Sequence, residues 1–224
     1  MSTTVTDNQS LDARNGNGSA PIRRGEILRK ILHVLPGGLP FLLVNLPHPD
    51  PLDKEALVYV SVVTALLTGL YLVSHRFVRR ADESDFISTA VSYPATVLAV
   101  LVLFPGNIEF TGVVVAVLAF GDASAYVVGK CLGKRCLPWN SDKTWAGTIA
   151  FVIVAAPIAS LSYWSLARPD VPVGLALLCG VCPAIAGAIA ESVPSRITDN
   201  LRVGVAAALT VVIVHFAAVD WFLS

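Results

Sequence analysis

The 224-residue chain is 54% hydrophobic and only 14% charged, and its mean hydropathy is +0.68. Soluble domains usually carry about 25% charged residues, so this composition excludes an ordinary soluble domain and indicates a membrane protein. The formal net charge is zero and by itself says nothing about partners; we expect a lipid bilayer and no nucleic acid.

The N-terminal segment, residues 1–25, is polar, and we predict that it is a disordered cytoplasmic tail. It contains no apolar run of the kind found in a cleaved signal peptide, and Asp7 and Asp12 argue against a transit peptide. Residues 26–224 are predicted to form a single transmembrane domain, because no linker in this part is long enough to separate two.

Apolar runs of about the length that a spanning helix needs, roughly 20 residues, follow one another along this domain. They cover residues 31–46, 56–73, 86–104, 110–128, 148–166, 171–190 and 203–222. The first run is weaker, because prolines and glycines at 36–40 interrupt it, and it is either kinked or re-entrant. The sequence therefore predicts an all-α, polytopic membrane helix bundle with about seven transmembrane helices.

Basic residues are distributed unevenly between the two predicted sides of the membrane. If all seven runs cross, 14 of the 16 lysines and arginines lie on the side of the N-terminus, and only Lys54 and Arg168 lie opposite. If the first run does not cross, the split is nine against seven. Because positive charge collects on the cytoplasmic side, we favour seven crossings with the N-terminus in the cytoplasm.

Asp122 is an acidic residue in the apolar run at 110–128. It precedes Lys130 by eight residues, which is roughly 12 Å of helix at 1.5 Å per residue, so it lies within the apolar zone. A carboxylate at such a depth is costly and marks a functional site or a buried ion pair. We favour a functional role for Asp122.

Small residues recur at every fourth position from the residue before this aspartate: Gly121, Ala125, Gly129 and Gly133. On a helix they share one face, which favours close packing against a neighbouring helix. The last two would also let the backbone approach a phosphate, and both interpretations stay open. The segment is not a P-loop, because its glycines are one residue too close and no Ser or Thr follows Lys134.

Cations crowd the same predicted end of the bundle, at Lys130, Lys134, Arg135 and Lys143. An ordinary cytoplasmic loop explains most of them. Lys143 differs, because it directly precedes a new apolar run and Thr144 is a suitable helix N-cap. A lysine beside a helix N-terminus is a favourable site for a phosphate group.

Acidic residues flank the loop between the last two runs: Glu191 ends one run, and Asp199 and Asn200 begin the next. Carboxylates from separate helices that face lysines provide what a nucleotide bound with Mg²⁺ requires. The alternative is that Glu191 and Asp199 simply pair with Arg196 and Arg202.

These segments together resemble a known family. GDASAYVVGKCLG followed by KTWAGT, and AESVP followed by TDN, are similar to the phytol and other polyprenol kinases. That family includes dolichol kinase and the CTP-dependent diacylglycerol kinases, and it is related to the phosphatidate cytidylyltransferases. The segment RKILH at 29–33 resembles its R-K-x-x-H opening, and the similarity extends from about residue 26 to 215.

The resemblance implies that residues 26–224 form a lipid-kinase domain that transfers the terminal phosphate of CTP to an isoprenoid alcohol such as phytol, geranylgeraniol or farnesol. It implies catalytic roles for Asp122, Lys143 and Glu191, and Mg²⁺ ligands at Asp122, Glu191 and Asp199. The implied nucleotide-binding residues are Gly129, Lys130, Gly133, Lys134, Lys143, Thr144, Gly147 and Asn200, and the supporting residues are Arg29, Lys30 and His33.

Two alternatives remain from the sequence. A phosphatidate-type cytidylyltransferase would use the same nucleotide site, but the chain lacks the His-Gly-Gly and Asp-Arg-x-Asp ending of those enzymes, which favours a kinase. A small transporter would use Asp122 as an ion site. We expect a membrane-resident alcohol and a nucleoside triphosphate as partners, allow for a homo-oligomer, and place the protein in a prokaryotic plasma membrane with its site facing the cytoplasm.

Overall fold

The computed structural model describes residues 30–44, 51–73 and 86–223. The predicted tail at 1–25 and Arg29 lie outside the described residues, so the structure does not test them. Within the described ranges, every predicted apolar run contains helix, and the prediction of an all-α membrane bundle is confirmed.

The first run is helical from residue 30 and continues through a 3₁₀ turn, η1 (Leu35–Gly38), into α3 (Leu39–Leu43). Pro36 and Pro40 each stand at the first positions of one of these elements, where a missing amide hydrogen is tolerated. The prolines therefore change the helix type instead of ending the helix, and we call residues 30–44 the entry helix.

The remaining helices follow in chain order. They are α4 (Lys54–Val73), α6 (Phe86–Leu103), α7 (Ile108–Ala116), the π turn η2 (Val117–Gly121), α8 (Asp122–Leu132), α9 (Trp145–Leu166), α10 (Val173–Ser192) and α11 (Asp199–Leu223). The elements α7, η2 and α8 form one uninterrupted helix, Ile108–Leu132. This helix includes the predicted run at 110–128 and extends beyond both of its ends.

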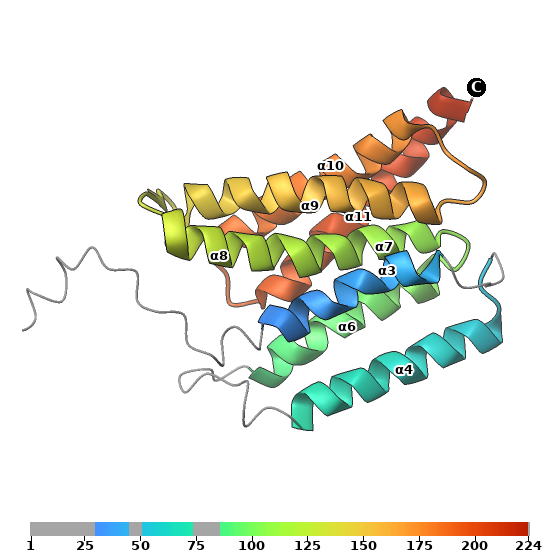
Figure 1. Ribbon diagram of the computed structural model, residues 1–224, viewed down its shortest axis with the longest axis horizontal. Helices are drawn as coiled ribbons and strands as arrows, with labels where there is room; N and C mark the ends of the chain where they lie inside the picture. Colours follow the sequence, from blue (N-terminus) through green and yellow to red (C-terminus); the bar gives the residue numbers. More distant parts are fainter. Residues whose placement is uncertain (1–29, 45–50, 74–85, 224) are drawn as a thin grey trace, which may run out of the picture.

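That long helix lies at the centre of the molecule (Figure 1). Every residue of α7 is buried, and the core around it includes Phe110, Phe151 and Tyr163. α9, α10 and α11 pack on one side of it, and the entry helix and α6 lie on the other, with α4 at the edge against α6 (Figure 1).

Among the described residues, four helices are long and apolar enough to cross a membrane: Ile108–Leu132, Trp145–Leu166, Val173–Ser192 and Asp199–Phe222. Lys30–Leu42 and Ile87–Leu103 are shorter apolar helices. Many large apolar side chains, such as Leu66 and Ile213, are exposed, as expected for a surface in contact with lipid. The integral membrane fold is supported, but the predicted number of seven crossings is not confirmed.

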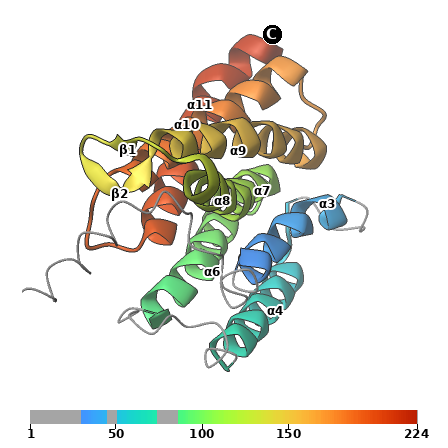
Figure 2. The same cartoon turned by 60° about the vertical axis from the view of Figure 1, so that its left-hand side comes forward.

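One part of the fold was not predicted. The basic loop between α8 and α9 contains a short antiparallel hairpin of β1 (Cys136–Leu137) and β2 (Asn140–Thr144), which stands at one end of the bundle (Figure 2). The C-terminus of α10 meets this hairpin through Ser192, whose carbonyl oxygen accepts a hydrogen bond from Asn140 at 3.0 Å. The bundle end that carries the hairpin and Lys30, Lys130, Lys143 and Arg202 is called the basic end below.

Candidate functional site

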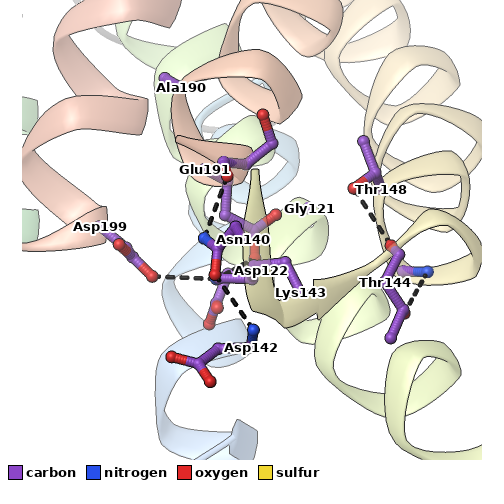
Figure 3. Close-up of polar contacts among 12 residues, drawn as sticks. Gly121, Asp122, Asn140, Asp142, Lys143, Thr144, Thr148, Ala190, Glu191 and Asp199 are labelled. Atoms are coloured by element: carbon purple, nitrogen blue, oxygen red, sulfur yellow. Dashed lines mark hydrogen bonds and ion pairs between the residues drawn. The ribbon is translucent and has the colours of Figure 1, made fainter. Parts of the chain in front are cut away.

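Lys143 is the centre of the first ionic group at the basic end. β2 carries it toward the end of α10 and the start of α11, so that its Nζ lies 2.7 Å from Glu191 Oε1 and 3.0 Å from Asp199 Oδ2 (Figure 3). Glu191 is only 5% exposed. Two helix ends that lie 48 and 56 residues beyond Lys143 therefore place their carboxylates on either side of this cation.

The carboxylates determine the charge state of Lys143. Burial alone would lower the pKa of this ammonium group, but Glu191 and Asp199 outweigh it and raise the pKa above its ordinary value. Lys143 is consequently protonated at every physiological pH. It provides a permanent positive charge that is held by hydrogen bonds to two acceptors.

Arg202 holds one of the two carboxylates, Asp199, and the end of α10. Its guanidinium group donates to Asp199, one turn away on α11, and to the carbonyl oxygens of Ala190 and Val193 at the end of α10. These carbonyls belong to a helix C-terminus, where unpaired acceptors favour a cation. The predicted pairing of Asp199 with Arg202 is thus present, whereas Glu191 pairs with Lys143 and not with Arg196.

Asp122 is the centre of the second ionic group. Its Oδ2 accepts a hydrogen bond from Lys30 Nζ at 2.6 Å and lies 3.5 Å from His33 Nε2. The Lys30 ammonium also lies 4.6 Å from the centre of the Tyr126 ring, a favourable cation–π distance. The entry helix therefore docks on α8 through residues that the family resemblance gave only a supporting role.

A π turn immediately precedes Asp122. Such turns are rare and occur often at functional sites. Within this one, the Leu118 carbonyl oxygen lies 3.0 Å from His33 Nε2. Because a carbonyl only accepts, Nε2 is the ring nitrogen that carries the hydrogen in this contact.

The two ionic groups belong to one site. Glu191, Lys143 and Asp122 lie close together at the basic end, where the labelled side chains of Figure 3 approach one another. They come from α10, β2 and α8, so the central helix links the entry helix to the hairpin. The predicted catalytic residues are therefore neighbours in space.

The small-residue face packs helices together, as one of the two interpretations predicted. A Cβ on Gly147 of α9 would lie 2.8 Å from the Ala125 carbonyl oxygen of α8, and one on Gly129 would lie 3.1 Å from Thr144 Oγ1. Gly133 directly follows α8 as its C-cap, and a Cβ on it would lie 2.7 Å from Thr144 Oγ1. With these contacts, Gly129 and Gly133 face the start of α9.

The predicted N-cap at Thr144 is confirmed. Its backbone is extended, and its side-chain oxygen accepts a hydrogen bond from the Gly147 amide at 3.2 Å. This cap fixes the start of α9 directly after Lys143 (Figure 3). The N-terminus of a long helix, with the positive end of its dipole, therefore lies next to the ionic site.

Three other predicted nucleotide-binding residues, Lys130, Lys134 and Asn200, differ in their exposure and in their contacts. Lys130 lies at the end of α8 with its Nζ 3.5 Å from the Tyr126 hydroxyl, and Lys134 is exposed just beyond it. Asn200 is buried, and its amide nitrogen donates to the Thr89 carbonyl oxygen of α6 at 3.0 Å. In this structure Asn200 joins α11 to α6.

The residues proposed as metal ligands do not form a group of three acidic, histidine or cysteine side chains that could hold a metal ion within the described ranges. Lys143 stands between two of them instead. The donor chemistry nevertheless fits Mg²⁺, because hard carboxylate oxygens from α10 and α11 converge on a single cationic atom. Asp122 contributes a third carboxylate from α8 in the same region.

Comparison with known proteins shows the family. The model of the cytidylyltransferase family matches residues 33–219. Similar curated proteins include the probable phytol kinase 2 of Glycine max, which is 28% identical over 81% of this chain and 63% of its own length. The farnesol kinase of Arabidopsis thaliana is 24% identical over 82% of this chain and 64% of its own, and the probable phytol kinase of Zea mays is 29% identical over 81% and 64%.

The chain thus spans slightly less than two thirds of the length of these relatives. All three are named as chloroplastic proteins of plants, which does not fit the expectation of a prokaryotic plasma membrane. No solved structure matches the chain. From the family match over most of its length, the chain belongs to the cytidylyltransferase family, and it is similar to proteins of plants named as phytol kinase and farnesol kinase.

Proposed function

We propose that this protein is a membrane kinase that transfers the terminal phosphate of a nucleoside triphosphate, with CTP as the donor, to an isoprenoid alcohol. The observation that carries the proposal is the meeting of Lys143, Glu191, Asp199 and Asp122 at the basic end of an apolar bundle. The names of the relatives, phytol kinase and farnesol kinase, support this class of acceptor.

In this proposal the hairpin, α10 and α11 bind the nucleotide. Lys143 and the N-terminus of α9 hold the phosphates, because both favour negative charge. Lys143 would move from the two carboxylates toward the phosphates, and Glu191 and Asp199 would then be the residues that hold Mg²⁺. The metal ion, when bound, neutralises charge on the phosphate oxygens.

The entry helix, α6 and α8 receive the alcohol from the bilayer. Its oxygen forms a bond to the terminal phosphorus, the bond from that phosphorus to the bridging oxygen breaks, and the nucleoside diphosphate leaves. Asp122 accepts the hydroxyl proton, and Lys30 holds the Asp122 carboxylate in position through its 2.6 Å contact. Positioning and electrostatic stabilisation account for most of the rate in such a transfer.

The test uses the full chain in detergent with Mg²⁺, γ-³²P-labelled CTP or ATP, and phytol, geranylgeraniol, farnesol or diacylglycerol. Label in the lipid phase with an isoprenoid alcohol supports the kinase, and the better donor settles the choice of nucleotide. A purified, folded protein that labels none of these lipids contradicts it.

The cytidylyltransferase activity is the second candidate, and the description of the family model favours it. It would join a cytidylyl group to phosphatidate and release pyrophosphate. Supplying phosphatidate with α-³²P-labelled CTP distinguishes the two activities, because only cytidylyl transfer then moves label into the lipid.

A further inference from the structure

Tyr93 of α6 carries a buried polar group that the site described so far does not use. The residue is only 8% exposed, and its hydroxyl has no hydrogen-bond partner within the described part of the chain. Leaving a buried hydroxyl unpaired costs stability, and such groups are few in native proteins. A buried hydroxyl without a partner among the described residues is a candidate for binding a ligand.

The neighbours of Tyr93 connect it to Asp122. Its ring centre lies 5.0 Å from that of His33, and His33 Nε2 lies 3.5 Å from Asp122 Oδ2. The tyrosine is therefore one aromatic ring away from the carboxylate that we propose as the proton acceptor. It belongs to the part of the site formed by the entry helix, α6 and α8.

The position of Tyr93 along its helix suits a lipid headgroup. It follows the start of α6 at Phe86 by seven residues, which is roughly 10 Å of helix. The hydrocarbon core of a bilayer is about 30 Å thick, so a lipid alcohol whose oxygen reaches Tyr93 would place that oxygen about a third of this thickness from the first residue of α6.

The surfaces on either side are apolar and exposed. Ile87 and Val91 of α6 are 69% and 40% exposed, and Ile31 and Leu35 of the entry helix are 57% and 70% exposed. In a membrane such side chains contact acyl or isoprenoid chains. The two elements that bring Tyr93 and His33 together thus also face the lipid phase.

We propose that the Tyr93 hydroxyl binds the oxygen of the lipid alcohol substrate. The phenol donates a hydrogen bond to this oxygen, and the hydrogen of the alcohol stays available to Asp122. The inference rests on the proposed kinase function. It adds a substrate-binding residue on α6, a helix that the sequence motifs did not include.

The experiment compares the full-length wild type with Tyr93→Phe, which removes only the hydroxyl. Tyr59→Phe is the matched control, since Tyr59 of α4 is 71% exposed. Three quantities are measured: equilibrium binding of ³H-geranylgeraniol in nanodiscs, the KM values for alcohol and nucleotide, and the thermal unfolding temperature.

We expect Tyr93→Phe to weaken alcohol binding and raise the alcohol KM by roughly tenfold, as the loss of one buried hydrogen bond implies. The nucleotide KM should stay the same. The unfolding temperature should not fall, because the variant removes a hydroxyl that has no partner among the residues that the structure describes. Tyr59→Phe should behave as the wild type in all three measurements.

Unchanged alcohol binding in Tyr93→Phe would overturn the inference, and so would a lower unfolding temperature with equal losses for both substrates. The result is separate from the test of the proposed function. Alcohol binding that depends on Tyr93 without phosphate transfer contradicts the kinase alone, whereas transfer that is insensitive to Tyr93 contradicts the inference alone.

Discussion

The contact between Asp122 and Lys30 allows the role of the carboxylate in the reaction to be separated from its role in the fold. The atoms are 2.6 Å apart, with side chains 26% and 13% exposed. At an effective dielectric constant of about 20, the Coulomb energy of this pair has a ceiling of about 6 kcal/mol. Breaking a buried pair by removing one partner costs about 3–5 kcal/mol.

We therefore expect Asp122→Asn to lower the free energy of unfolding by about 2–3 kcal/mol, below that range because the carboxylate keeps some contact with solvent. For a chain of this size the unfolding temperature should fall by about 5–10 °C. If Asp122 accepts the proton of the alcohol, turnover should fall by roughly 10²- to 10⁴-fold, far more than the loss of stability explains.

The double variant Asp122→Asn with Lys30→Met tests this reasoning. Removing both charges avoids an unpaired ammonium at the entry helix, so most of the stability should return, while turnover should stay as low as in the single variant. The assays are thermal unfolding in detergent and lipid labelling from γ-³²P-CTP. Recovery of turnover in the double variant would show that Asp122 only anchors Lys30, and the proposed proton transfer would be refuted.

The remaining predictions concern packing, capping and pH. Gly37→Val should lower the unfolding temperature by a few degrees, because a Cβ at this position would lie only 2.6 Å from the Phe120 ring. Gly38→Val is the control, since no atom lies within 4 Å of a Cβ at position 38. Thr144→Ala should cost about 1 kcal/mol of stability by removing the N-cap of α9, and Thr144→Ser should restore most of it. The pKa of Lys143 is raised in the folded protein, so the stability that its charge contributes is fully present below the ordinary lysine pKa and is lost only at higher pH. The unfolding temperatures of wild type and Lys143→Met should therefore differ by a constant amount from pH 6 to 9.

Each of these has a result that would contradict it. Equal unfolding temperatures for the Gly37 and Gly38 variants would mean that the entry helix does not pack on the π turn. If Thr144→Ala is as stable as the wild type, the N-cap hydrogen bond of Thr144 does not stabilise the start of α9. Curves that diverge between pH 6 and 9 would show that Lys143 or one of its two carboxylate partners titrates in that range.

Much of the fold follows from patterns that are local in the sequence. A long apolar run has few alternatives to a helix in a bilayer, because every backbone polar group must be paired. The cap at Thr144 also depends on a local pattern, an extended residue with a short side-chain oxygen before an apolar helix. The depth of Asp122 could be counted along the helix for the same reason.

The contacts that form the site join residues far apart in the sequence, and local patterns therefore could not predict which side chains meet. Lys143 meets Glu191 and Asp199 across 48 and 56 residues, so the pairing depends on how β2, α10 and α11 pack. The hairpin itself has strands too short to show an alternating pattern. Asn200 is a further example, because its predicted role in nucleotide binding stays a prediction, whereas the hydrogen bond from its amide nitrogen to the Thr89 carbonyl oxygen could not be foreseen from a local pattern.

The arrangement of charges also suggests how a membrane protein keeps such a site stable before its substrates arrive. Lys143 is neutralised by two carboxylates and Asp122 by Lys30, so no charge in the two groups lacks a partner, and the cost of burial is reduced. In the proposed kinase, the negative charge of a nucleotide would compete with Glu191 and Asp199 for Lys143. The two carboxylates would then be the residues that hold Mg²⁺, whose charge would replace that of the ammonium group. Under this proposal nucleotide and metal bind together, because both depend on the same exchange of partners at Lys143.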